Sequence, residues 1–253
     1  MDNLFLIAGG GVLAGLLAGI LGIGGGTVLV PLITTLGYTP LQAVATSSLA
    51  ILLTASSGSI QNYRMGYITL ASVFSLGLAA IITAQFGVYF ASLIPDYLLL
   101  VGFGTVLLSN VGLAHWRRRL MKQGYDTPTP LKKNLSRVFT GGSAGFLAGL
   151  FGIGGGVILV PLQMILLAQP IKGAIQTSLG VIVITSISST VGHAMQGNVL
   201  FLQGILLGIG GLIGAQVSTR YLPKLPDRAV TFSFYTLMTL LAVYSFWQAT
   251  QIE

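Results

Sequence analysis

The chain has 253 residues, 53% of them hydrophobic and only 7% charged, and its mean hydropathy is +0.88. Soluble domains carry roughly a quarter charged residues, so this composition excludes a water-soluble globular protein. The apolar content excludes a disordered chain, and the lack of cysteine excludes disulfides, thiolate metal sites and cysteine nucleophiles. The formal net charge of +7 comes mostly from one short segment. We therefore expect an all-α polytopic membrane protein.

The first half predicts a broken helical segment followed by three spanning helices. The residues before Leu4 lack the basic character of a signal peptide, so we expect the first apolar run to be retained. Leu4–Leu36 is too long for one simple helix and is interrupted by GIGGG at 22–26, which suggests a re-entrant helix pair. A spanning helix needs about 20 apolar residues. Three stretches qualify: Leu41–Gln61, Tyr67–Phe90 and Pro95–Trp116.

A basic segment, 117–137, separates the two halves and begins with Arg117-Arg118-Arg119. The positive-inside rule predicts that it is a cytoplasmic loop. It lacks the folded scaffold and interleaved aromatic residues of a nucleic-acid site, so we expect no nucleic-acid partner.

The second half repeats the pattern, since GIGGG recurs 130 residues later at 152–156. We place a one-residue insertion near Gln196. Val138–Leu167 is the second broken segment, and three further spans follow: Ile171–Met195, Val199–Tyr221 and Pro226–Gln248. Internal repeats are typical of transporter folds. We therefore divide the chain into an N-terminal repeat (1–116), the basic loop (117–137) and a C-terminal repeat (138–253).

The distribution of basic residues bears on topology. If each broken segment crosses the membrane once, the protein has about eight spans in parallel repeats, with 8 of the 12 Lys and Arg residues inside. If each segment enters and returns, the repeats are inverted and all 12 lie on the cytoplasmic side. The positive-inside rule favours the inverted arrangement.

The duplicated glycine motif is the leading candidate for a binding site. In each motif the glycines look like a helix break followed by a new helix, whose N-terminus offers free N–H groups and partial positive charge to a small anion. The alternative is that glycines only allow close helix packing, which we prefer for Gly9, Gly10, Gly11, Gly15 and Gly19. The expected substrate-binding set from the motif comprises Gly24, Gly25, Gly26, Thr27, Gly154, Gly155 and Gly156. Alanine at Gly25 and Gly155 is then expected to abolish transport without loss of folded protein.

Hydroxyl and amide side chains at equivalent positions extend this set. We pair Ser47 with Thr177 and Ser48 with Ser178, near the membrane interior, where their hydroxyls could donate hydrogen bonds to an oxyanion. Hydroxyl groups also bond neighbouring helices, and that alternative explains many others in these spans. Gln85 and Gln216 form a further pair, with interhelical bonding and cavity lining as equal alternatives.

Few titratable groups lie within the spans. His193 is a candidate for a proton or pH role, against the more ordinary interpretation of an interfacial histidine. Asp96 and Asp227 follow prolines at span starts, where we expect capping or interfacial roles. No span centre carries an acidic or basic residue, and no catalytic, cofactor or metal-ligand motif occurs. We therefore expect no enzymatic activity, no cofactor and no metal site.

The duplicated GIGGG-x3-VP motif, the TSSLAI and TSLGVI stretches and the central basic loop resemble the TauE/SafE sulfite exporter family, also called TSUP permeases. The resemblance covers nearly the whole chain and implies transport of sulfite, sulfonate, sulfoacetate or a related anion through a cell (inner) membrane. With the cell interior negative, export of one negative charge gains about 2.3 kcal/mol per 100 mV, so we expect an exporter working by alternating access. The alternatives are a passive anion channel, an uptake permease for another small organic anion coupled to H⁺ or Na⁺, and a membrane assembly or regulatory protein. The sequence gives no indication of an oligomeric state.

Overall fold

The computed structural model describes residues 2–122 and 130–251, with side chains in 7–113 and 134–251. The described residues form α-helices and one short 3-10 helix, and they contain no strand. In chain order the elements are α1 (Asp2–Leu21), α2 (Gly26–Thr35), α3 (Pro40–Arg64), α4 (Leu70–Ala91), α5 (Asp96–Lys122), α6 (Pro130–Phe151), α7 (Gly156–Leu166), α8 (Ile171–Met195), α9 (Phe201–Tyr221), η1 (Leu222–Lys224) and α10 (Asp227–Ala249).

In the described part of the chain, six helices are long and apolar enough to cross a membrane, namely α3, α4, α5, α8, α9 and α10. They coincide with the six predicted spans, so the prediction of an all-α polytopic membrane protein is confirmed. The basic segment differs from expectation, because α5 continues to Lys122 and α6 already begins at Pro130. Much of 117–137 is therefore the ends of two helices rather than loop.

Local sequence signals set the ends of the two central helices, α3 and α8. The Thr39 hydroxyl accepts a hydrogen bond from the Gln42 amide, and the Gln42 side chain accepts one from the Thr39 amide, each at 3.2 Å. This capping box, with Pro40 as the first helical residue, starts α3. Both helices then stop at a glycine with positive φ, which closes the last turn: Gly66 (76°) after α3 and Gly197 (74°) after α8.

The central helices also fix the register between the repeats. Each has 25 residues, but Pro40 is the first residue of α3 whereas Pro170 precedes α8 as its N-cap. The extra residue of the second repeat therefore lies in the α7–α8 connection, where Ala168 has a positive φ of 52°. Our placement of the insertion near Gln196 was wrong, and from α8 onward equivalent positions differ by 131.

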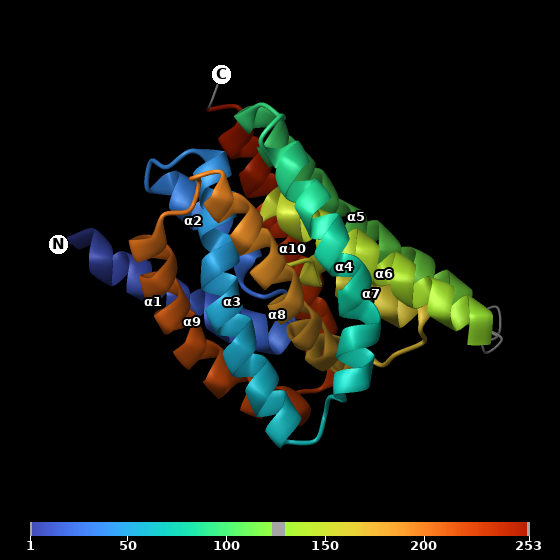
Figure 1. Ribbon diagram of the computed structural model, residues 1–253. Coiled ribbons are helices and arrows are strands. Elements are labelled where there is room, and N and C mark those ends of the chain that lie inside the picture. Colours follow the sequence, from blue (N-terminus) through green and yellow to red (C-terminus); the bar gives the residue numbers. More distant parts are fainter. Residues whose placement is uncertain (1, 123–129, 252–253) are drawn as a thin grey trace.

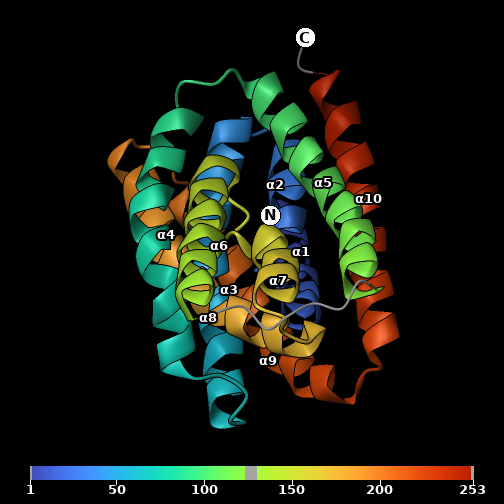
Figure 2. The same ribbon diagram turned by 90° about the vertical axis from the view of Figure 1, so that its right-hand side faces the viewer.

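Basic residues gather at one end of the molecule, which we call the basic end. α3 and α9 finish there and α8 and α10 begin there, as Figures 1 and 2 show. The start of α8 is tied to the start of α10 by an ion pair of 3.3 Å between Lys172 and Asp227. At the opposite, far end, the Leu200 amide at the start of α9 bonds the Thr46 hydroxyl near the start of α3, at 3.1 Å. The equivalent helices α3 and α8 therefore run in opposite directions.

The broken pairs pack against helices of the other half along glycine seams. α1 lies on α9, where Gly11 and Gly15 face the backbone of Leu207 and Gly211. α6 lies on α4 in the same way, with Gly141, Gly145 and Gly149 against the backbone of Leu76, Ala80 and Ala84. α3 packs on α8 in the middle, while α5 and α10 lie side by side at one edge (Figure 2). Close backbone packing thus accounts for Gly11 and Gly15, the interpretation preferred from the sequence.

Candidate functional site

Each glycine motif breaks one helix and starts another inside the protein. Gly24 and Gly25 have φ of 74° and 84°, and α2 begins at Gly26; Gly154 and Gly155 have φ of 67° and 76°, and α7 begins at Gly156. Positive φ is a conformation that glycine adopts without the cost it imposes on other residues. We call residues 22–27 and 152–157 the two tips. Every residue of both tips is buried.

The two tips touch each other. A methyl group at Gly26 would overlap the carbonyl oxygen of Gly152, and one at Gly156 would overlap that of Gly22. Gly24 and Gly154 both lie against Ile51 of α3 and Ile182 of α8, which are at the middle of those helices. The predicted motif residues Gly24, Gly25, Gly26, Gly154, Gly155 and Gly156 are therefore brought together at the centre of the molecule.

Two serines hold the tips in place with equivalent hydrogen bonds. The Ser47 hydroxyl of α3 contacts the carbonyl oxygens of Gly152 (2.8 Å) and Val44 (2.9 Å). Ser178 of α8 contacts those of Gly22 (2.9 Å) and Ile175 (2.8 Å). The structure thus pairs Ser47 with Ser178, because of the shifted register, and not with Thr177 as we proposed. Both hydroxyls are already used in fixing the tip backbone.

Ser48 belongs to a different contact, which joins the two halves and has no counterpart at the equivalent positions. Its hydroxyl lies 3.0 Å from that of Ser189, which lies 3.4 Å from the carbonyl oxygen of Ala148 on α6. The equivalent positions carry Leu179 and Gly58, which pack without a hydrogen bond.

Thr27 is the tip residue with unused hydrogen-bonding capacity. It lies in the first turn of α2, is completely buried, and its hydroxyl has no partner among the described residues. The equivalent position in α7 is Val157, so this hydroxyl is unique to the first tip. Thr177 is also buried, and its hydroxyl makes no hydrogen bond within the described part of the chain.

The paired glutamines bond neighbouring helices away from the tips. The Gln85 amide of α4 donates to the carbonyl oxygen (2.7 Å) and hydroxyl (2.9 Å) of Ser188 on α8. At the equivalent contact between α3 and α9, the Ser57 hydroxyl donates to the side-chain oxygen of Gln216 (3.1 Å). The side-chain amide of Gln216 donates in turn to Gln61 (2.9 Å). Gln85 also borders an apolar pocket between α4 and α8. Interhelical bonding is the interpretation that these contacts support.

His193 lies in the last turn of α8 and is completely buried. One ring nitrogen, Nε2, lies 2.9 Å from the carbonyl oxygen of Gly149 on α6. The other, Nδ1, has no partner among the described residues.

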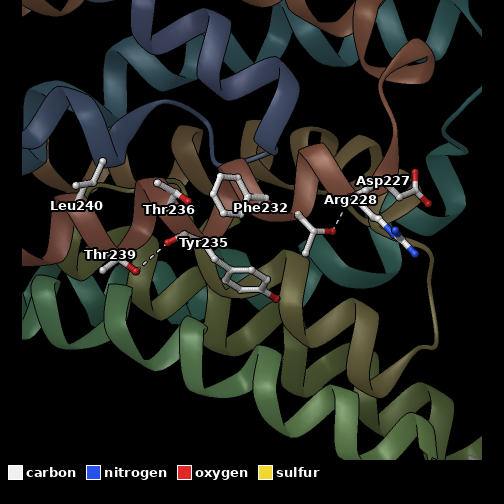
Figure 3. Close-up of a pocket in the computed structure, with 8 residues that line it drawn as sticks. Asp227, Arg228, Phe232, Tyr235, Thr236, Thr239 and Leu240 are labelled. Atoms are coloured by element: carbon white, nitrogen blue, oxygen red, sulfur yellow. Dashed lines mark hydrogen bonds between the residues drawn. The ribbon is translucent and has the colours of Figure 1, made fainter.

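Sequence reasoning missed a groove along α10, of about 860 Å³. Its described lining consists of Asp227, Arg228, Thr231, Phe232, Tyr235, Thr236, Thr239 and Leu240. Figure 3 shows Asp227 and Arg228 at one end of this row and Leu240 at the other. Asp227 is paired with Lys172, whereas Arg228 is exposed and forms no ion pair within the described residues. The four-residue spacing of Thr231, Tyr235 and Thr239 is the sequence signal that could have revealed this polar stripe.

Comparison with known proteins places these features in a family. The family described as "Sulfite exporter TauE/SafE" matches residues 7–245. The chain is 26% identical to the "Probable membrane transporter protein YunE" of Bacillus subtilis, covering 91% of this chain and 93% of that protein. It is 27% identical to the "Probable membrane transporter protein YdhB" of the same organism (92% and 97%) and 27% identical to a "Probable membrane transporter protein" of Xylella fastidiosa (98% and 97%). No solved structure matches the chain.

Proposed function

This chain belongs to the TauE/SafE sulfite exporter family, and from that premise we propose that it carries small sulfur-containing oxyanions out of the cell by alternating access. The expected substrates are of the sulfite, sulfonate or sulfoacetate type, and the expected location is a bacterial-type cell (inner) membrane. The family and the transporter relatives make the chain an integral, multi-pass membrane protein of the transporter class. The substrate, the direction and the mechanism are our proposal.

The observation that carries the proposal is the meeting of two helix starts in the middle of the molecule. The first N–H groups of α2 and α7 have no partner within their own helices, and each start carries partial positive charge. The unpartnered Thr27 hydroxyl adds a donor at the same place. No charged residue lies in either tip, so a bound oxyanion would meet dipoles and hydroxyls rather than a competing carboxylate.

Burial of the tips supports alternating access. The backbones of the two tips are in contact, and every tip residue is buried. An anion could reach the N–H groups only after the tips separate, and it would then lie between the two halves. Inverted repeats in other transporters open alternately to the two sides in this way.

The charge distribution supports an orientation with the basic end in the cytoplasm. Arg64, Lys172, Arg220, Lys224 and Arg228 all lie at that end, as the positive-inside rule requires for a cytoplasmic face. In this orientation Arg228, which lines one end of the groove on α10, lies on the cytoplasmic side. We propose that Arg228 attracts the anion to this end of the groove before the tips open, because an exposed guanidinium forms charge-assisted hydrogen bonds to oxyanions.

Thr27 provides the sharpest test of this site. If its hydroxyl donates to the anion, T27V should raise the half-saturation concentration for sulfonate flux about tenfold, whereas T27S should stay close to the wild type. The measurement is flux into proteoliposomes containing purified protein. Thermal unfolding provides the control, and T27V should not lower the melting temperature because the hydroxyl has no partner to lose among the residues that the structure describes. A wild-type half-saturation concentration in T27V would contradict the proposed site.

A further inference from the structure

The surroundings of His193 are those of a neutral imidazole with one free lone pair. Its Nε2 lies 2.9 Å from the Gly149 carbonyl oxygen, which can only accept, so Nε2 carries the proton. Nδ1 is then an acceptor, and it is buried without a donor in the described part of the chain. A second proton on Nδ1 would give a cation while the bond to Gly149 remains in place.

The other half of the molecule has no titratable group at the equivalent position, which is Asn62 of α3. Asn62 is as fully buried as His193 and its side chain has no hydrogen-bond partner among the described residues. Packing therefore tolerates an amide at this position, and a histidine is not required to form the fold. His193 near the far end is therefore ionisable, whereas Asn62 at the equivalent position near the basic end is not.

The cation formed at His193 would lie at the C-terminal end of α6. Gly149 lies three residues before Gly152 of the second tip, and three residues span about 4.5 Å along a helix. The C-terminal end of a helix stabilises positive charge, and a positive charge this close to the tip attracts an anion bound there. Protonation and anion binding should thus strengthen each other, since coupling between two sites is reciprocal.

We propose that protonation of His193 raises the affinity of the tip site for the anion, an inference that rests on the proposed anion site at the tips. His193 lies close to the far-end surface, because Met195, two residues further along α8, is 84% exposed.

Few other ionisable groups could produce the same effect. Most ionisable side chains on the helices packed against α8 lie toward the basic end of the molecule. They are Tyr63 and Arg64 of α3, Arg137 of α6, and Asp227, Arg228 and Tyr235 of α10. At the far end Tyr89 of α4 is exposed and Tyr244 of α10 bonds Thr35. The Asp96 carboxyl group accepts a hydrogen bond from the backbone of Leu41. None of these side chains hydrogen-bonds His193.

The test compares the wild type with H193N, which introduces the residue that the first repeat already has. The substrate is ethanesulfonate, which stays a monoanion across the range of about pH 5 to 8 where histidine titrates. We expect the apparent affinity of the wild type to rise about fivefold or more as the pH falls, the lower range of typical coupling between sites. H193N should transport with an affinity that does not change with pH. T190V, which removes a buried unpartnered hydroxyl from the same helix, is the control that should keep the wild-type pH profile.

Proton uptake gives a second readout that needs no variant. Binding of ethanesulfonate to the wild type in weakly buffered solution should take up protons, and a pH-sensitive dye records this. Absence of proton uptake, or an unchanged pH profile in H193N, would overturn the proton site while leaving the transporter intact. Failure of the wild type to bind or move any sulfur oxyanion would instead contradict the proposed function.

Discussion

Gly155 shows how strictly the tips depend on glycine. Its φ is 76°, and a methyl group there would overlap the carbonyl oxygen of Ala144 on α6. Gly37 has a similar φ of 90° but open space around it. We expect G37A to cost about 1–2 kcal/mol from backbone strain alone, and G155A to cost clearly more because α6 and α7 must also move apart. Thermal unfolding of the purified variants measures the difference, and equal losses would show that the contact with Ala144 is unimportant.

The contact of Gly155 with Ala144 changes the expected effect of alanine substitutions in the glycine motif. From the sequence we expected alanine at Gly25 and Gly155 to abolish transport and leave the fold intact. The packing of Gly25 against Ala14 of α1 and of Gly155 against Ala144 of α6 argues instead for a loss of stability. Thr27, which has no partner to lose, is the better probe of binding.

The contacts of the candidate site were only partly predictable from the sequence. The run of glycines predicts a helix break because few other residues adopt positive φ. It cannot reveal that Ser47 contacts the Gly152 backbone, which lies 105 positions away. Such contacts depend on how the two halves meet, and the pairing of hydroxyls also changed with one residue of register.

The opposite directions of equivalent helices lead to a prediction about their ends. Arg64 finishes α3 at the basic end, and the equivalent residue Met195 finishes α8 at the far end. Because the chain has no cysteine, R64C and M195C each introduce a single reactive thiol. In oriented vesicles a membrane-impermeant maleimide should modify R64C from the cytoplasmic side and M195C from the outside, since both positions are exposed. Labelling of both from the same side would contradict the inverted repeats.

Helices were easier to predict than their connections. The six spans follow from apolar length alone, because a bilayer demands it. Apolar length did not predict that α5 and α6 extend into the basic segment. Lys and Arg are good helix formers, so a helix can continue past its last apolar residue. The groove on α10 was missed because its hydroxyls, read singly, resemble ordinary hydroxyls that bond their own helix, as Thr231 and Thr239 also do.

The whole molecule combines two halves that meet at buried tips, a polar groove from the basic end and an ionisable residue near the far end. Helices α1 and α6 each pack along a helix of the other half, and the two tips touch. In our proposal the tips open when the halves shift relative to one another. Sequence similarity covers this entire arrangement, since the family matches residues 7–245. A carrier that exposes its site alternately differs from a pore in one measurable respect. Its binding site must face the first side again before it can transport another anion.

Substrate exchange across the membrane tests that difference most directly. Proteoliposomes loaded with unlabelled sulfonate and placed in a low concentration of labelled sulfonate should accumulate the label transiently above equilibrium, with a rate that saturates as the external concentration rises. This overshoot requires a site that carries one anion inward as it carries another outward. Label that only equilibrates, at a rate proportional to concentration, would indicate a passive channel, and no movement of any sulfur oxyanion would contradict the substrate class.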